Sequence, residues 1–377
     1  MPEQDFIVIP DAAPVTVALE PVQNAIYSLL LLTKAEHISG LSDWVPRTVN
    51  TLTPRERKRH ELVFIGLHYA LVPEQSWSSF PVYVDHLATR NPNALRDKML
   101  TAYAKRPLLT NGENQVWYDE PHPIDLGAIL KDVDSYLDFL RERYDMDKSD
   151  AELEAQAYSY VVDPPAMQDL IVSHLRKMWD EYLAPEWERV EPMLRDSVNA
   201  FQQIDLGKMS KLEAAQLITG QELEREEWEW KFEQVEKVVF VPSAHVGPYL
   251  GKLGACRDTL WVLFGARFPE GIQFEAPGLS RTEIVVRLSA LADDNRLQIL
   301  KLISDKGELS SREIMSSLGF SQSAASRHLQ QLSATGYLSE RRCNGAKCYQ
   351  LKPERIENTL QAISNFLLGK QTRSSRV

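Results

Sequence analysis

Helical and strand-like patterns of apolar residues follow one another closely between residues 295 and 351. The segment 295–303 is a short and largely apolar helical stretch, which predicts a helix buried in a small bundle. A second helix is predicted after Ser310, because Ser310 and Glu313 can form a capping box at its start. This helix ends at Gly319, a typical C-terminal cap residue. Its inward face carries Ile314, Met315 and Leu318.

A third helix follows almost at once. Ala325, Leu329 and Leu332 recur on one face of it, and Gly336 ends it. Two short helices joined by a turn of about three residues have the geometry of a helix-turn-helix, in which the second helix enters the major groove of DNA. The pattern therefore predicts a recognition helix over residues 322–335.

The next segment alternates with the period of a β-hairpin over residues 338–351. The turn is expected at Asn344-Gly345, the dipeptide that most strongly predicts a two-residue hairpin loop. The alternating positions are Leu338, Glu340, Arg342, Tyr349 and Leu351. Such a hairpin after a helix-turn-helix has the place of a wing, and the chain is expected to be a DNA-binding transcriptional regulator.

Segments 292–300, 319–329 and 336–338, together with the basic hairpin, resemble the ArsR-type winged-helix repressors. The resemblance covers about residues 282 to 352, a fifth of the chain. It implies a homodimer that binds an operator in double-stranded DNA through two recognition helices, in a prokaryotic cytoplasm. Residues 1–275 resemble only the long N-terminal domains of unknown role in some regulators of this type.

The remaining pattern predicts a mainly α (α+β) chain of two domains. Residues 1–275 are expected to form a helical regulatory or dimerisation domain with a small sheet, and residues 280–370 the winged helix. The three expected strands lie near 15–19, 237–241 and 259–264. A long helical stretch over 165–205 is expected to kink or break at Pro185.

A final helix is predicted from about Pro353 to Leu368. Its apolar stripe consists of Ile356, Leu360, Ile363 and Leu367. The stripe faces either a partner subunit, as the resemblance implies, or the core of its own domain.

Charge divides the 377-residue chain into two unequal parts. The whole chain carries a formal charge of −11, but the residues from Arg281 onward hold 15 Lys and Arg against 9 Asp and Glu, a net +6. The first 280 residues carry −17 and should repel DNA. Because no apolar run is long enough for a membrane helix and no secretory signal begins the chain, we expect a cytoplasmic protein without membrane contact.

The recognition helix supplies the first group of candidate DNA contacts. Its outward face carries Gln322, Ser323, Ser326, Arg327 and Gln330. Arginine and glutamine can make bidentate contacts to guanine and adenine, and Ser321 at the helix start can hold a phosphate. The alternative is a solvated helix face. His328 either packs or contacts a phosphate. Further candidates at the start of the preceding helix are Ser310, Ser311 and Arg312.

The wing supplies the second group, Arg341, Arg342 and Lys347, which are expected to contact phosphates and position the protein on DNA. The alternative is a charged edge strand that discourages aggregation.

The chain is expected to need no metal or other cofactor. In metal sensors of the ArsR type the resemblance implies thiols at the start of the first helix of the motif, where Ser310 and Ser311 stand. The zinc-sensing alternative needs histidines on the last helix, which has none. Cys343 and Cys348 could be bridged if the turn were centred on Gly345-Ala346. With the turn at Asn344-Gly345, Cys343 opposes Ala346 and bridging is expected to fail.

The N-terminal part offers few chemical signals. His60 and His68 could share a helix face but lack a third metal ligand nearby, and no reaction-bearing motif occurs. Its eight tryptophans could line the pocket of a small-molecule effector or could simply be core residues. The expected regulator is therefore not an enzyme. The alternatives are a winged helix used as a protein-interaction module and an enzyme in residues 1–275 tethered to DNA.

Overall fold

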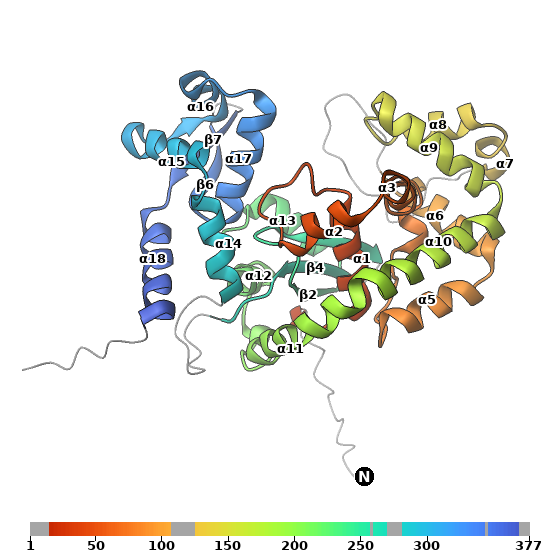
Figure 1. Cartoon of the computed structure of the whole chain (residues 1–377), viewed down its shortest axis with the longest axis horizontal. Coiled ribbons are helices and arrows are strands. Elements are labelled where there is room, and N and C mark those ends of the chain that lie inside the picture. Colours follow the sequence, from red (N-terminus) through yellow and green to blue (C-terminus); the bar gives the residue numbers. More distant parts are fainter. Residues whose placement is uncertain (1–14, 107–124, 257–258, 270–280, 344–345, 369–377) are drawn as a thin grey trace, which may run out of the picture.

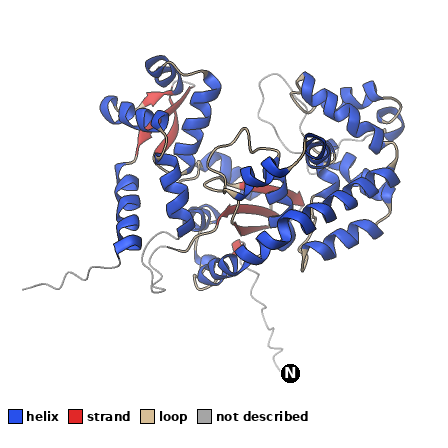
Figure 2. Cartoon of the chain, in the orientation of Figure 1, coloured by secondary structure: helices blue, strands red, loops and turns tan. Residues whose placement is uncertain are grey.

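The computed structural model describes residues 15–106, 125–256, 259–269, 281–343 and 346–368. Helices dominate and the strands form two small sheets (Figure 2), which confirms the predicted mainly α class with a small β component. We call the described residues before 270 the body and residues 281–368 the winged helix. The winged helix lies beside the sheet-bearing end of the body (Figure 1).

A four-stranded sheet runs through the body and joins its first and last segments. Its strands are β1 (Val15–Val17), β2 (Lys237–Ser243), β3 (Gly251–Cys256) and β4 (Thr259–Gly265), in the order β1-β2-β4-β3. β1 is parallel to β2 and β2 to β4, while β3 is antiparallel to β4. The sequence pattern does not predict β3, because its two glycines are poor strand formers.

Alternate residues of β2 and β4 point to opposite faces of this sheet and fill two separate cores. One core lies against α1 and the helices up to α10, and it includes Val239, Val241, Trp261 and Leu263. The other lies against α11, α12 and α13, and it includes Val238, Phe240, Val262 and Phe264. The sheet is therefore buried on both sides.

The body helices mostly begin at a capping side chain or at a proline, whose fixed φ suits the first helical turn. They are α1 (Pro21–Leu32), α2 (Trp44–Thr51), α3 (Pro54–Glu61), α4 (His68–Leu71), α5 (Phe80–Thr89), α6 (Pro92–Ala104), α7 (Leu126–Ile129), α8 (Val133–Arg141), α9 (Lys148–Val161), α10 (Pro164–Met178), α11 (Ala184–Phe201), α12 (Lys211–Thr219) and α13 (Arg225–Glu233). Two π-helical turns, Leu62–Gly66 and Trp179–Leu183, and a 3₁₀ turn, Leu206–Lys208, connect some of them.

The long helical stretch predicted over 165–205 consists of α10 and α11. The interruption falls at the π-helical turn Trp179–Leu183, and Pro185 stands in the first turn of α11, where its missing donor costs no hydrogen bond. The inward face of α10 is buried as its period predicts, with Leu170, Ile171, His174, Leu175 and Met178.

The winged helix has its own hydrophobic core, built around Ile299, Leu329 and Tyr337. Its elements are α14 (Arg281–Leu291), α15 (Asp294–Lys306), β5 (Leu309–Ser310), α16 (Ser311–Leu318), α17 (Gln322–Ala334), β6 (Leu338–Cys343), β7 (Ala346–Leu351) and α18 (Pro353–Leu368). The hairpin strands pair as β5-β7-β6, and the two-residue β5 is not apparent from the sequence. Across the described residues, no helix is both long and apolar enough to span a bilayer.

Candidate nucleic-acid interface

The turn between α16 and α17 is fixed by local hydrogen bonds. Ser310 accepts from the backbone N–H of Glu313 at 3.3 Å, while the Glu313 carboxylate accepts from the backbone N–H of Ser310 at 2.8 Å. Gly319 ends α16 in the left-handed region with φ of 71°. Ser321 then caps α17 by accepting from the N–H of Ala324 at 3.3 Å. These contacts set the angle at which α17 leaves the motif.

The recognition helix α17 has one buried and one open face. The inward residues Ala325, Leu329 and Leu332 are at most 1% exposed. The outward side carries five exposed polar side chains, Gln322, Ser323, Ser326, Arg327 and Gln330. This face can therefore present amide, hydroxyl and guanidinium groups to a base-pair edge.

The remaining candidates around the motif take different positions. His328 is half-buried against Phe320, with ring centroids 5.8 Å apart, and its Nδ1 lies 3.8 Å from an Asp293 carboxylate oxygen. Burial lowers the pKa of His328, so the ring is neutral near pH 7. Ser310 is engaged as a cap, Ser311 is half-buried, and Arg312 is exposed.

The three cations of the wing differ in their partners. Arg341 forms a bidentate pair with Glu308, with N–O distances of 2.5 Å, and Lys347 pairs with Glu340 at 2.5 Å. Arg342 is exposed and makes no ion pair within the described part of the chain. Phosphates must therefore compete with carboxylates for Arg341 and Lys347, but not for Arg342.

The wing cysteines correct one expectation. The register pairs Cys343 with Ala346, as a turn at Asn344-Gly345 requires, yet Cys343 and Cys348 form a disulfide. Both cysteines project from the same face of the hairpin as diagonal neighbours, with Cα atoms 6.0 Å apart. The expectation that bridging fails was wrong because it considered only directly opposite residues.

The recognition helix also contacts the body through Gln331, a residue that carried no distinctive signal in the sequence. Ser39 Oγ donates to Gln331 Oε1 at 2.6 Å, and the Tyr249 hydroxyl donates to the Ser39 carbonyl at 2.5 Å. Gln331 is 1% exposed and lies so close to Gly40 that a side chain there would meet its amide. One edge of α17 is thus covered by a loop that is nearly 300 residues distant in the sequence.

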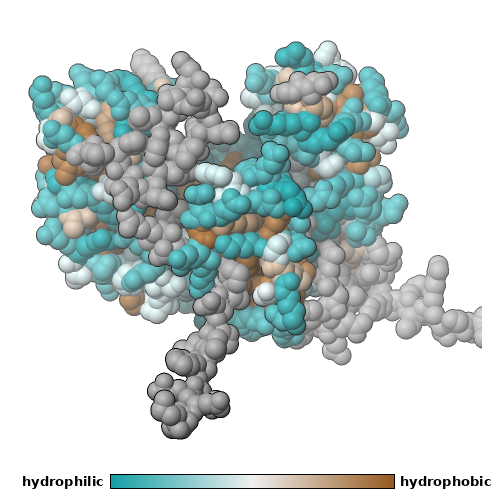
Figure 3. All heavy atoms as spheres, turned by 180° about the vertical axis from the view of Figure 1, so that it is seen from behind, coloured by the Kyte–Doolittle hydropathy of each residue, from teal (hydrophilic) through white to brown (hydrophobic). Residues whose placement is uncertain are grey.

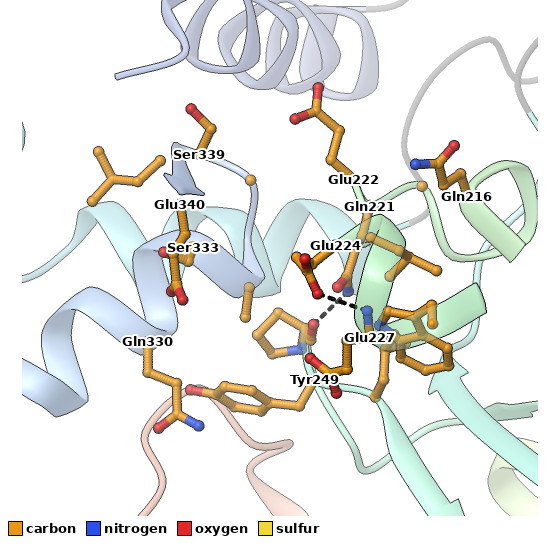
Figure 4. Close-up of a pocket in the computed structure, with 18 of the residues that line it drawn as sticks. Gln216, Gln221, Glu222, Glu224, Glu227, Tyr249, Gln330, Ser333, Ser339 and Glu340 are labelled. Carbon is orange, nitrogen blue, oxygen red and sulfur yellow. Dashed lines mark hydrogen bonds between the residues drawn. The ribbon is translucent and has the colours of Figure 1, made fainter. Parts of the chain in front are cut away.

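Beside this contact, the C-terminal end of α17 and the wing face an acidic wall of the body across a cleft of about 1590 Å³. Figure 4 shows Gln330, Ser333 and Glu340 on one side, and a group of body residues on the other that includes Gln221, Glu222, Glu224 and Glu227. Lys352, next to the wing, forms an ion pair with Glu222. Seen from behind, the molecule has a notch between its two parts (Figure 3).

The cleft matters for any approach of DNA. A helix inserted in the major groove, about 12 Å wide, has a phosphate chain on each side. Carboxylates of the body stand beside the C-terminal end of α17 and the wing in this arrangement. They would repel a phosphate chain and partly occupy its place.

The histidines and tryptophans of the body are mainly structural. His60 pairs with His174 through Nδ1 and Nε2 at 2.9 Å, not with His68, from which a π-helical turn separates it. Trp44 and Trp261 are buried in the core, while Trp228 and Trp230 line the cleft; Trp117 lies outside the described residues. No cluster of three or more metal-binding side chains occurs in the part that the structure describes.

A Ser-His-Glu chain in the body has the residue types of a hydrolytic site. Ser28 Oγ lies 2.7 Å from His245 Nδ1, and His245 Nε2 lies 3.1 Å from a Glu186 carboxylate oxygen. All three side chains are buried, with Ser28 only 2% exposed. The chain connects α1, α11 and the segment after β2, and a substrate cannot reach Ser28 in this arrangement.

Comparison with known proteins agrees with the geometry of the winged helix. The profile of the family described as "Bacterial regulatory protein, arsR family" matches residues 293–340. The arsenic resistance transcriptional regulator ArsR2 of Pseudomonas putida is 37% identical over 91 residues, which cover 22% of this chain and 79% of that protein. The chain belongs to the ArsR family. It is a DNA-binding transcriptional regulator.

A second relative, the arsenic resistance transcriptional regulator ArsR1 of Pseudomonas putida, is 40% identical over 81 residues, which cover 21% of this chain and 63% of that protein. Most of this ArsR-family chain, including the whole described body, lies outside the 293–340 match. The family therefore accounts for the winged helix and leaves the role of the body to its own structure.

Proposed function

We propose that this regulator is a homodimeric repressor that binds operator DNA through residues 322–335 and the wing, residues 338–351. The observation that carries the proposal is the open polar face of α17 above a fully buried stripe. Gln322, Ser323, Ser326, Arg327 and Gln330 read base edges in this proposal. Phosphate contacts come from Ser310, Ser311, Arg312, Ser321, His328 and the three wing cations.

The dimer is proposed to form through α14 and α18. These helices pack together, and each exposes large apolar side chains away from the core of the winged helix. On α14 Leu288 is 37% exposed, and on α18 Leu360 and Leu367 are 57% and 70% exposed. Ile356 instead packs against the core of its own domain. The apolar stripe predicted on α18 therefore serves the local core at Ile356 and is free for a partner subunit at Leu360 and Leu367. The exposed apolar set fits a self-complementary interface.

The body is proposed to be a separate regulatory domain. The core of the winged helix contains no body residue, so each part can retain its fold when they move apart. Because the acidic wall stands beside α17, we propose that operator binding requires the body to move away from the recognition helix. The direct links to be broken include Ser39 to Gln331 and Lys352 to Glu222.

A binding measurement on the full chain tests the proposed function. The DNA probe is the promoter region of the protein's own gene, compared with random DNA of equal length at two salt concentrations. We expect preferential binding to the promoter and an affinity for both DNAs that falls as salt rises. Equal affinity for both DNAs would contradict operator recognition, and salt-independent binding would contradict phosphate contacts.

The dimer has its own test in sedimentation. Leu360→Asp with Leu367→Asp should convert the protein to monomers, because each partner would bury a charge in the interface. Val82→Asp, at an exposed apolar position on α5 of the body, is the matched control and should leave the dimer intact. A double variant that sediments like the wild type would place the dimer contact elsewhere.

A further inference from the structure

A second cavity, of about 770 Å³, lies at the junction of the body and the winged helix. It is lined from the body by residues of α2, α11 and the segment after β4, and from the winged helix by residues of α14, α17 and α18. Figure 1 shows α14 between α18 and the sheet-bearing end of the body. The cavity is therefore formed jointly by the two parts, and their separation would divide its lining.

The lining of this cavity is strongly basic. Among the described residues, the lining contains seven arginines and two carboxylates, those of Asp43 and Glu283. Arg267 of the body is buried, lies 3.3 Å from a Glu283 oxygen, and donates to the Leu217 carbonyl. Arg355 of α18 donates to the carbonyls of Thr335 and Gly220. Positive charge from both parts thus converges on one partly open cavity.

Arg287 of α14 is the most informative member of this group. It is 4% exposed, and its guanidinium makes no hydrogen bond or ion pair with any residue that the structure describes. Burial lowers the pKa of Arg287 to about 10, and the charges of Arg355 and Arg267 contribute to the lowering, against Glu283. The Arg287 guanidinium thus lines the cavity with Glu283 opposing the repulsion from Arg355 and Arg267, and an anion in the cavity would offset that repulsion.

We propose that the junction cavity binds a small multivalent oxyanion, bearing carboxylate or phosphate groups, with Arg287 as its central contact and Arg267 and Arg355 beside it. The cavity has the size of metabolite pockets, about 300–1,000 Å³. Planar guanidinium groups suit oxyanions because they donate two parallel hydrogen bonds. The ligand would therefore connect the body to both α14 and α18.

The site would also control DNA binding, a consequence that rests on the proposed function. Without an anion, repulsion of Arg267 by Arg287 and Arg355 opposes the Arg267–Glu283 and Arg355–Gly220 contacts between the two parts, which makes the junction easier to separate. With an anion bound, the repulsion is cancelled and the parts are held together, with α17 beside the acidic wall. The ligand should therefore lower affinity for the operator, and operator DNA should lower affinity for the ligand by the same factor.

Anion binding is tested on the full-length protein by thermal unfolding. Pyrophosphate tests for binding of phosphate groups and citrate for binding of carboxylate groups. Each anion is compared with sodium chloride at equal ionic strength. We expect the melting temperature to rise with one of the two anions beyond the chloride effect. No rise with either anion would overturn the proposal.

Arg287→Met separates a ligand site from a structural residue. It should abolish the anion-induced rise, and it should raise the melting temperature without anion, because it removes a poorly solvated charge that Arg355 and Arg267 repel. The control is Arg195→Met, an exposed cation of α11 paired with Glu191 outside the cavity lining, which should respond to the anion like the wild type. An Arg287→Met protein that still responds, or that is less stable without anion, would contradict the assignment.

The effect of the anion on DNA affinity is measured separately, by fluorescence anisotropy with labelled promoter DNA. At a saturating concentration of the active anion, affinity for DNA should fall at least about fivefold, the lower end of typical coupling between sites. Arg287→Met should bind DNA equally with and without the anion. Anion binding with unchanged or increased DNA affinity would overturn the control mechanism, whereas absence of DNA binding under all conditions would instead contradict the proposed function.

Discussion

Arg327 is the recognition-helix side chain whose loss should most reduce sequence discrimination. It is exposed one turn beyond Ser323, and it forms no ion pair among the described residues. Arg327→Ala should reduce the preference for the operator over random DNA by about 1–3 kcal/mol if the guanidinium contacts a guanine. The measurement is the ratio of dissociation constants for the two DNAs.

The matched control for Arg327 is Lys301→Ala, which removes an exposed positive charge of α15 that is paired with Asp305. This variant should keep the wild-type ratio, because Lys301 lies outside the recognition helix and its charge is already paired with Asp305. If Arg327→Ala keeps the ratio as well, Arg327 does not read a base.

The wing residues should differ in how strongly they affect the salt dependence of binding. Arg342→Ala should reduce the log–log slope of affinity against salt by about 0.9, the value of one phosphate contact. Arg341→Ala should reduce it less, because Glu308 already neutralises that guanidinium. The triple variant Arg341→Ala, Arg342→Ala, Lys347→Ala should weaken binding to operator and random DNA alike.

Glu308→Gln is the informative control for the wing, since it releases Arg341 while leaving all wing cations in place. It should steepen the slope. An unchanged slope in all of these variants would show that the wing does not contact the DNA backbone.

At the scale of elements, the sequence predicts the helix caps and turns whose structure depends on residues close together in the chain. The capping box of Ser310 and Glu313, the αL cap at Gly319 and the hairpin around residues 344–345 depend on residues a few positions apart. These elements form as predicted. β3 was missed because its glycines conceal a strand that only pairing with β4 stabilises.

The interface between the parts was beyond such local reasoning. Gln331 looks like any polar residue near a helix end, and its burial depends on Ser39 and Gly40, far away in the sequence. Arg287 gives no local sign of lacking a partner. The open face of α17 could be predicted from its period, whereas the acidic wall beside the C-terminal end of that helix could not.

The first turn of α16 and the wing together predict the response to soft metals. Ser310 and Ser311 occupy the positions where the family resemblance implies thiols, and the wing thiols are joined in a disulfide. One equivalent of zinc, cadmium or arsenite should therefore leave operator affinity unchanged in the oxidised protein, although the named relatives are arsenic resistance regulators. Titration of each ion into the protein–DNA complex measures this.

A chelator control should likewise leave affinity unchanged. Specific release by one equivalent of any of the ions would require a site that the described residues do not reveal. Release only after reduction with a phosphine would instead place that site at Cys343 and Cys348.

The buried pair of α3 and α10 should make the body sensitive to acid. Burial lowers the pKa of His60 to about 4 and that of His174 to about 3. Both folded values lie below the usual 6.5, so the unfolded chain binds more protons below pH 6.5. Stability is lost as pH falls from there toward 4, at about 1.4 kcal/mol per pH unit for each histidine.

Urea unfolding between pH 7 and pH 5, followed by tryptophan fluorescence, measures this slope, because all eight tryptophans lie before residue 275. His174→Gln should lower the slope by about the contribution of one histidine. His37→Gln, at an exposed position, should leave it unchanged. Equal slopes in all three proteins would mean that the pair does not resist protonation.

On the scale of the whole molecule, the charge of the body and its position beside the winged helix both oppose DNA binding. The first 280 residues carry −17 and the rest +6, and the acids of the body include those that stand opposite α17 and the wing. An approaching duplex therefore meets general repulsion at long range, and at short range a recognition helix whose C-terminal end is covered by the body. Only the general repulsion would disappear at high salt, where the Debye length is short.

Removal of the body should separate these two effects. Residues 280–377 should fold, because the winged helix has its own core, and should bind operator at least as well per dimer as the full chain at low salt. The gain should shrink as salt rises toward physiological strength, where screening shortens to about 8 Å. A gain in DNA affinity that persists at high salt would measure how strongly the body sterically blocks α17. Circular dichroism checks folding, and anisotropy over a salt series measures affinity.

Removal of the body would instead weaken DNA binding if the body supplied the dimer contacts, since a monomer loses the advantage of binding two half-sites together. The exposed apolar residues of α14 and α18 are retained in the fragment, so the dimer should survive. Sedimentation shows whether the fragment is a dimer or a monomer. A folded but monomeric fragment with poor DNA affinity would place dimerisation in the body. A dimeric fragment whose affinity never exceeds that of the full chain would show that the body does not restrain the recognition helix, and the closed arrangement would then have no part in regulation.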